Sequence, residues 1–183
     1  MILAKPFKVI TMGISCVILS ISLVFAAIVG KDAPYFRVTS GSDEVLTLDM
    51  LKGKIVVIFY ETKDTKEKNR ALKEELNAFY ADQPPEAQEG IAKIAIIRCS
   101  SFLPTIWRRS LRENSKKEGI IIYGDWDGSM EKNYDMAADE SNFLIIDKSG
   151  VVRYVRADVI PEEDFPIIKK ILNELQEPMS GQR

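Results

Sequence analysis

The side chains that could do chemistry in this sequence are few. The 183-residue chain contains no histidine, which removes the commonest general base and the commonest metal ligand. Cysteine occurs twice, and because Cys16 lies in an apolar N-terminal run, Cys99 is the only thiol in the rest of the chain. The charge of the preceding Arg98 would lower a thiol pKa, but free cysteines are mostly buried and behave as small hydrophobes. We therefore expect Cys99 to be buried and inert.

Two pairs of acidic residues are the other candidates. Asp64 and Glu67 stand at the start of an expected helix, where they fit a capping box and face the positive end of the helix dipole. A catalytic acid would need a shielded site that raises its pKa, so we favour the cap. Asp125-Trp126-Asp127 begins like a calcium loop, but methionines occupy its sixth and twelfth positions in place of Gly and Glu. The sequence therefore predicts no metal site, and a turn in which an exposed Trp126 could contact a partner.

The first 30 residues differ from the remainder. Lys5 and Lys8 precede a charge-free run at 9–29. This run is longer than the core of a cleavable signal and close to the length of about 20 residues that a spanning helix needs. Cleavage after Ala26 and retention as an anchor both remain open, and either places the rest outside the cytoplasm. We expect residues 1–30 to be a signal peptide or signal anchor and 31–183 to form one domain. The net charge of −2 argues against a nucleic-acid partner.

The hydrophobic pattern predicts alternating strands and helices. Strands are expected at 45–48, 54–60, 91–98, 120–123, 142–146 and 151–155, the last two as a hairpin. Helices are expected at 64–81, 104–117 and 129–138, with a closing amphipathic helix around 168–175 and a loop at 82–90. This order predicts an α/β fold with a central mixed β-sheet flanked by helices on both faces.

Several short motifs carry a family resemblance over residues 33–176. Ala33-Pro34-x-Phe36 and the run from Phe143 to Gly150 resemble the exported thioredoxin-like and peroxiredoxin-like families. In redox-active members an aromatic pair ends the first core strand and Cys-x-x-Cys follows. Aligned on Phe59-Tyr60, that position holds Asp64-Thr65-Lys66-Glu67, with Thr65 where a peroxiredoxin has its peroxide-attacking cysteine. The resemblance implies a thioredoxin-like fold without its thiols.

The chain also resembles the YtfJ family of periplasmic thioredoxin-like proteins that lack the redox cysteines. Lys66-Glu67-Lys68-Asn69 and Arg109-Ser110-Leu111 carry this likeness. It implies a thioredoxin-like fold and a periplasmic location. We expect no cofactor.

Two functions from different classes follow. The first is a non-enzymatic interaction or scaffold module that binds another envelope protein, with contacts at Thr62, Lys63, Asp64, Glu67 and Trp126. The alternative is a redox enzyme that uses Cys99 as its single thiol. A separate set of basic residues on the second helix is either a solvated face or a patch for an anionic membrane surface: Arg108, Arg109 and Arg112.

Overall fold

The computed structural model describes residues 28–99 and 102–177 of the chain. In chain order the elements are β1 (Arg37–Ser40), β2 (Val45–Thr47), the 3-10 helix η1 (Leu48–Leu51), β3 (Ile55–Glu61), α2 (Arg70–Ala81), α3 (Pro85–Glu89), β4 (Ile91–Arg98), α4 (Pro104–Glu118), β5 (Ile122–Asp125), α5 (Ser129–Tyr134), β6 (Asn142–Ile146), β7 (Val152–Ala157), η2 (Glu162–Asp164) and α6 (Phe165–Gln176).

One mixed sheet runs through the molecule in the order β2-β1-β5-β4-β3-β6-β7. β3, β4 and β5 are parallel to one another, whereas β6 is antiparallel to β3 and β1 is antiparallel to β5. The apolar run of β3 is buried because both of its neighbours pair with it and both of its faces are covered. The carboxyl ends of the three parallel strands consequently meet at one edge of the sheet.

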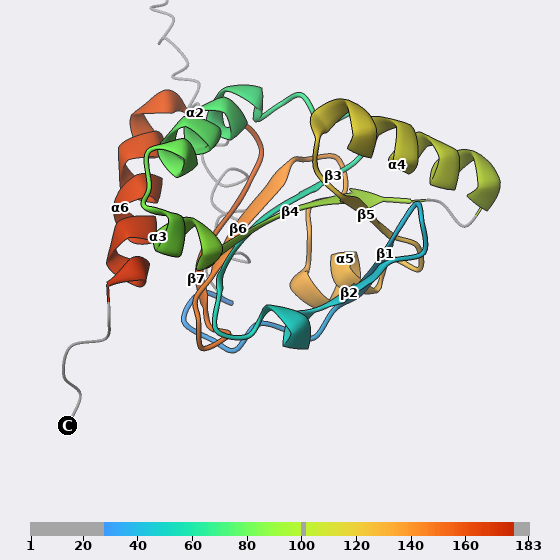
Figure 1. The fold of residues 1–183 in the computed structure, drawn as a ribbon. Coiled ribbons are helices and arrows are strands. Elements are labelled where there is room, and N and C mark those ends of the chain that lie inside the picture. Colours follow the sequence, from blue (N-terminus) through green and yellow to red (C-terminus); the bar gives the residue numbers. More distant parts are fainter. Residues whose placement is uncertain (1–27, 100–101, 178–183) are drawn as a thin grey trace, which may run out of the picture.

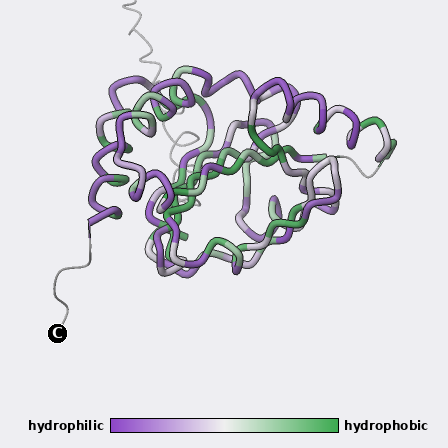
Figure 2. The backbone as a smooth tube through the Cα atoms, in the orientation of Figure 1, coloured by the Kyte–Doolittle hydropathy of each residue, from purple (hydrophilic) through white to green (hydrophobic). Residues whose placement is uncertain are grey.

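The two faces of the sheet have separate cores. Figure 1 shows α2, α4 and α6 on one side of the sheet, with α5 and η1 on the other. Alternate residues of β3 divide between them, so that Ile55 and Val57 face α2 and α6 while Val56 and Ile58 face α5 and the N-terminal strands. Hydrophobic residues accordingly concentrate along the central strands, and the helices are largely hydrophilic (Figure 2).

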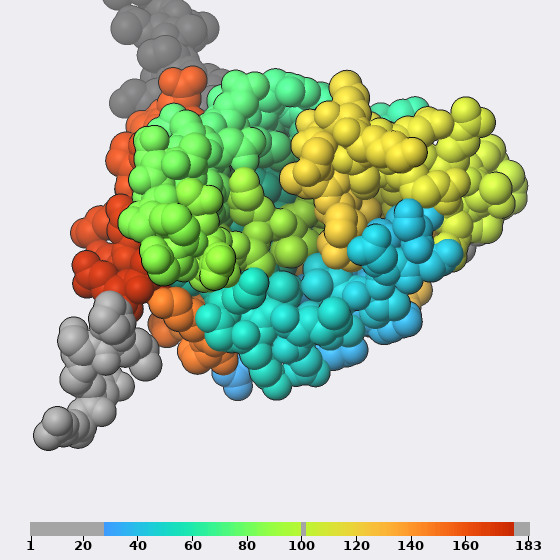
Figure 3. Space-filling view, viewed as in Figure 1, coloured from blue at the N-terminus to red at the C-terminus, as the bar shows by residue number. Residues whose placement is uncertain are grey.

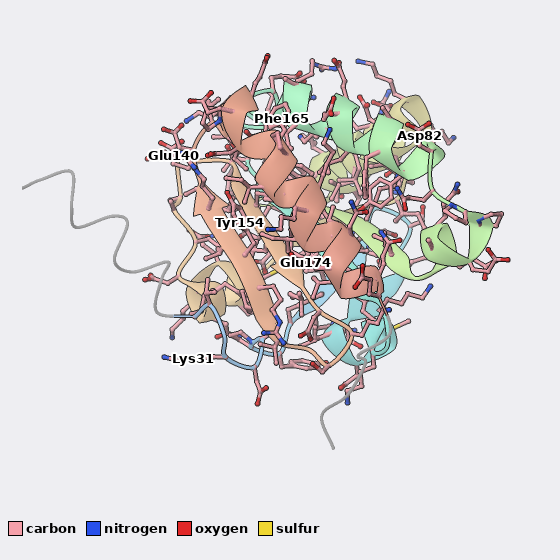
Figure 4. All side chains as sticks on the ribbon, turned by 90° about the vertical axis from the view of Figure 1, so that its left-hand side faces the viewer. Lys31, Asp82, Glu140, Tyr154, Phe165 and Glu174 are labelled. Carbon is pink, nitrogen blue, oxygen red and sulfur yellow. The ribbon has the colours of Figure 1, made fainter. Side chains whose placement is uncertain are left out.

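The closing helix α6 lies across the last strands of the sheet. In Figure 4 it runs from Phe165 towards Glu174 beside the strand that carries Tyr154. The Tyr154 ring makes an edge contact with Phe143, with the two ring centroids 5.8 Å apart. Ile168 and Leu172 of α6 belong to the same core cluster as Leu72 of α2, so the two helices pack side by side on this face.

The predicted α/β class, the mixed sheet and the helices on both faces are confirmed, as are the bounds of β4 and β6. The expected loop at 82–90 contains α3, which begins at Pro85 because proline suits the first helical position. Strand β1 was not expected. β5 starts only at Ile122, after an exposed isoleucine pair. α5 ends at Tyr134 because Asp135 adopts a left-handed conformation.

The leader predicted at 1–30 lies almost entirely outside the described residues. Among those that are described, no helix combines the length and apolarity needed to cross a membrane. Ile28 packs against the core, and Gly30 donates a backbone hydrogen bond to Val152. The globular part of the chain is therefore already in contact with its own sheet at residue 28.

Candidate functional site

A wide hollow lies at the carboxyl end of the parallel strands. It has a volume of about 720 Å³ and is lined by Thr62, Lys63, Asp64, Arg98, Cys99, Trp107, Trp126 and Asp127. Of the predicted contacts, Thr62, Lys63, Asp64 and Trp126 are brought together here, and Cys99 lies among them. Glu67 and Lys66 face a neighbouring groove instead. Trp107 was not predicted, and Arg98 and Asp127 were considered from the sequence but not as contacts.

The loop after β3 is closed by two threonines. The Thr65 hydroxyl accepts a hydrogen bond from the Thr62 backbone N–H at 2.9 Å, and the Thr62 hydroxyl accepts from the N–H groups of Asp64 and Thr65. Thr65 is buried by this arrangement. The hydroxyls of Thr62 and Thr65 are thus already engaged in hydrogen bonds to the backbone of this loop.

The predicted capping box is wrong. α2 begins at Arg70, not at Asp64, and residues 63–69 form turns. The Asp64 side chain is exposed and makes no hydrogen bond to any described residue. Glu67 turns towards Arg70, whose Nε donates to it at 2.7 Å, and this hydrogen bond lowers the pKa of the Glu67 carboxyl. The two threonines provide the local hydrogen bonds that the carboxylates were expected to make.

Cys99 is fully buried, as expected. Burial, reinforced by the charge of Asp125, raises the pKa of its thiol to about 12. The positive charge of Arg98 acts in the opposite direction but does not prevail, because the guanidinium forms an ion pair with Glu131 and donates to the Cys99 carbonyl. At neutral pH the thiolate that nucleophilic chemistry requires is almost absent.

A buried polar cluster underlies the hollow. Asp125 is fully buried, and one of its carboxylate oxygens accepts from the Tyr60 hydroxyl at 2.9 Å and from the Glu131 N–H at 3.1 Å. Its other oxygen has no hydrogen-bond partner among the described residues. Burial and the nearby Asp125 together raise the Tyr60 pKa. The expected turn therefore has one acid directed into the protein, and only Asp127 remains exposed.

Trp126 is less available than the sequence analysis expected. The side chain is partly buried against the cluster that contains Cys99, and its Nε1 donates to the Thr39 carbonyl at 3.1 Å. The Arg108 guanidinium lies 5.3 Å from the centre of its ring. Trp126 therefore forms a fixed wall of the hollow, with Arg108 beside it.

The arginines of α4 are engaged within the chain. Arg108 forms an ion pair with Asp43, and Arg109 pairs with Glu113 at 2.7 Å. Arg112 donates to the Gly41 carbonyl at 2.7 Å. The structure places Arg109 and Arg112 away from the residues that line the hollow.

A second polar network next to the hollow was missed by the sequence analysis. The buried Glu61 carboxylate accepts from Lys73 at 2.7 and 2.8 Å and from the Ser141 hydroxyl at 2.8 Å. The Asn69 side-chain amide donates to the same hydroxyl. The sequence signal for this network was Glu61, an acidic residue at the end of the otherwise apolar β3. Its partners Lys73 and Ser141 are 12 and 80 residues further along the chain. The network fixes the start of α2 relative to Ser141, just before β6.

Comparison with known proteins gives a likeness of fold. No protein-family model matches the chain, and no curated protein matches its sequence. Three similar solved structures come from different bacteria. A candidate protein disulfide isomerase from Bacteroides thetaiotaomicron is 22% identical, with 82% of this chain and 91% of that chain covered and a TM-score of 0.57. A candidate thiol:disulfide interchange protein DsbE from Chlorobium tepidum is 15% identical, with 80% and 96% covered and a TM-score of 0.60.

The third is the exposed lipoprotein thioredoxin of Streptococcus pneumoniae strain TIGR4, which is 14% identical, with 78% and 100% covered and a TM-score of 0.55. Identities this low establish shared architecture and transfer no activity. The chain has a thioredoxin-like α/β fold.

Proposed function

We propose that this protein is a non-enzymatic binding module of the cell envelope that uses the hollow at the carboxyl end of its parallel strands to hold another protein. One observation supports the proposal: the loop that the sequence motifs align with the Cys-x-x-Cys of redox-active families is closed by two threonines, and burial raises the pKa of the nearby Cys99 to about 12. The architecture is retained while the reactive thiolate is lacking.

The surface around the hollow supports a protein partner. Two tryptophans, Trp107 and Trp126, line it together with charged residues of both signs. Aromatic residues surrounded by polar groups are typical of the centres of protein interfaces. The N-terminal tip of α4 adjoins it through Trp107 and adds exposed apolar side chains: Leu103 is 53% exposed and Ile106 is 62% exposed. Figure 2 shows this hydrophobic tip at the end of an otherwise hydrophilic helix.

The redox alternative, with Cys99 as the single reactive thiol, is less favoured. Cys99 does lie beside Asp64, as such an enzyme would need, but it is 0% exposed. An attacking thiol works best when its pKa is near the ambient pH. The burial of Cys99 moves its pKa in the opposite direction.

Location and family are part of the proposal. The apolar run at 9–29 supports export, either as a cleaved signal or as an anchor. The likeness to an exposed lipoprotein thioredoxin agrees with that location. Membership of the YtfJ family rests on the motifs of the sequence. A membrane surface is the less favoured partner because Arg108, Arg109 and Arg112 each have a partner within the chain.

Site-specific photo-crosslinking tests the binding proposal. A photoreactive amino acid at Ile106, beside the hollow, should yield a discrete crosslinked protein in intact cells, and Lys63→Glu on the loop should weaken that product. The same photoreactive group at Lys132 on α5, on the other face of the sheet, is the matched control. Identical products from both positions, or products unaffected by Lys63→Glu, would count against the proposed surface.

A further inference from the structure

A second cavity lies between α2 and α4, next to the hollow described above, with which it shares Lys63 and Trp107. Figure 3 shows the surface hollowed between the green helices α2 and α3 and the yellow α4. This α2–α4 groove has a volume of about 230 Å³, and β3, β4 and β5 form its floor. Its walls include Tyr80 from α2 and Leu111 from α4.

The floor of the α2–α4 groove is apolar and incompletely covered. Phe59, Ala95 and Ile97 lie side by side on neighbouring strands and are only half-buried, in contrast to the fully buried residues elsewhere on β3. The floor of the groove is uncovered because α2 begins only at Arg70, and the turns before it do not cover this part of the sheet. Apolar surface left open in a concave site is available for a ligand.

The charge along the groove is predominantly positive. Five cations line it, against three carboxylates: Lys63, Lys66, Arg70, Lys73 and Lys93 against Glu61, Glu67 and Glu118. Lys73 is neutralised by Glu61 at 2.7 Å, and Arg70 is paired with Glu67. A negatively charged ligand therefore complements the site.

Lys93 marks the place for a negative group. Its Nζ donates to the Asn77 side chain at 3.1 Å and lies 4.5 Å from the centre of the Tyr80 ring, and in the described part of the chain no carboxylate pairs with it. Lys93 is solvent-exposed as a residue, and the partial burial of its ammonium group against Tyr80 lowers its pKa. The Tyr80 hydroxyl, on a side chain that is 5% exposed, has no hydrogen-bond partner within the described residues. The wall of the groove thus carries a cation that has no counter-ion among the described residues.

We propose that the α2–α4 groove binds a small amphiphilic carboxylate, a medium-chain fatty acid, with its carboxylate at Lys93 and its alkyl chain on Phe59, Ala95 and Ile97. The carboxylate supplies the counter-ion that Lys93 lacks. The alkyl chain removes the half-buried floor from water. The volume of about 230 Å³ lies below the range of drug-sized ligand sites, which selects a small ligand.

Isothermal titration calorimetry of the purified protein with octanoate tests the inference. Butyrate, which keeps the carboxylate but has little apolar surface, and 1-octanol, which keeps the chain without the charge, are the comparison ligands. We expect saturable 1:1 binding of octanoate and at least about tenfold weaker binding of each comparison ligand, because each loses one of the two contributions.

Two variants locate the site. Lys93→Met keeps the alkyl stem and should weaken octanoate binding about tenfold, the scale of one charge-assisted hydrogen bond. Ala95→Leu should weaken it by filling the floor. Lys132→Met, which removes the same charge from the opposite face of the sheet, should bind octanoate as the wild type does. Circular dichroism confirms that each variant is folded before titration.

Absence of saturable octanoate binding, equal binding by Lys93→Met, or equally tight binding of 1-octanol would overturn the inference. None of these results depends on the proposed protein partner, whose crosslinking is read at Ile106. The two proposals therefore fail separately.

Discussion

Replacing Asn69 by alanine should destabilise this protein far more than replacing Asp64. The Asn69 side chain is 2% exposed and joins three segments. Its amide donates to the Ser141 hydroxyl and to the Asp158 carbonyl, both at 2.9 Å, and its oxygen accepts from the buried Ile160 N–H at 2.8 Å. Each such hydrogen bond contributes about 1 kcal/mol net, and a buried N–H left without a partner costs about 1–3 kcal/mol.

The two hydrogen bonds that the amide donates and the unpaired Ile160 N–H together sum to about 3–5 kcal/mol for Asn69→Ala, a large fraction of the roughly 5–15 kcal/mol that stabilises a typical domain. Asp64→Ala should change the free energy of unfolding by less than about 0.5 kcal/mol, because the exposed carboxylate caps nothing. Asn173→Ala, at an exposed asparagine of α6, is the matched control and should also be near neutral.

Urea denaturation followed by circular dichroism measures these differences as shifts of the midpoint at constant slope. The reasoning is refuted if Asn69→Ala unfolds at the wild-type midpoint, or if Asp64→Ala loses as much stability as Asn69→Ala. The second result would restore the helix cap that the sequence suggested.

Three further predictions follow from single side chains. The carboxyl of Asp147 is partly desolvated, which raises its pKa, but hydrogen bonds from Ser149 and Val151 outweigh this and leave the pKa below its ordinary value of 3.8. The ionised carboxylate therefore stabilises the fold above about pH 4, and this stabilisation is lost as the pH falls through the folded-state pKa. The difference in the free energy of unfolding between wild type and Asp147→Asn, measured in urea, should be largest near pH 7 and should narrow towards pH 2. Cys99, studied with Cys16→Ser, should react with iodoacetamide at pH 8 far more slowly when folded than in urea; equal rates would contradict its burial. Gly41→Ala should lower the free energy of unfolding by about 1–3 kcal/mol, because the added Cβ would lie 2.9 Å from a backbone nitrogen of α4. A melting temperature equal to that of the wild type would show that α4 shifts to accommodate the methyl group.

The fold was predictable from the sequence where a strand is mostly apolar. β4 and β6 are mostly apolar runs of strand length, and their observed bounds are those predicted. β6 is buried along its whole length, whereas β4 carries the exposed Lys93 and ends at Arg98. β1 was not predicted because the alternation in Arg37–Ser40 covers only four residues and the buried positions include a serine. α3 was predicted as a loop because a proline pair is as typical of a loop as of the start of a helix.

The candidate site was predictable only in part. The absence of a Cys-x-x-Cys pair is visible in the sequence, and so are four of the predicted contacts that meet at the hollow. The start of α2 was predicted wrongly because Asp64-x-x-Glu67 matches a capping box, while the competing Thr62 and Thr65 hydrogen bonds have no comparable sequence signature. The Glu61–Lys73–Ser141 network depends on residues that only the folded sheet brings together.

The most direct test of the central claim is a turnover assay of the purified protein with insulin disulfides and with a hydroperoxide. The account predicts that neither substrate is consumed above background, because reduction requires a thiolate and burial raises the pKa of Cys99 to about 12. Turnover that disappears in Cys99→Ser would contradict the account and establish the single-cysteine enzyme. Turnover that survives in Cys99→Ser would contradict the assignment of the loop at Thr62–Glu67 as the site of the lost chemistry.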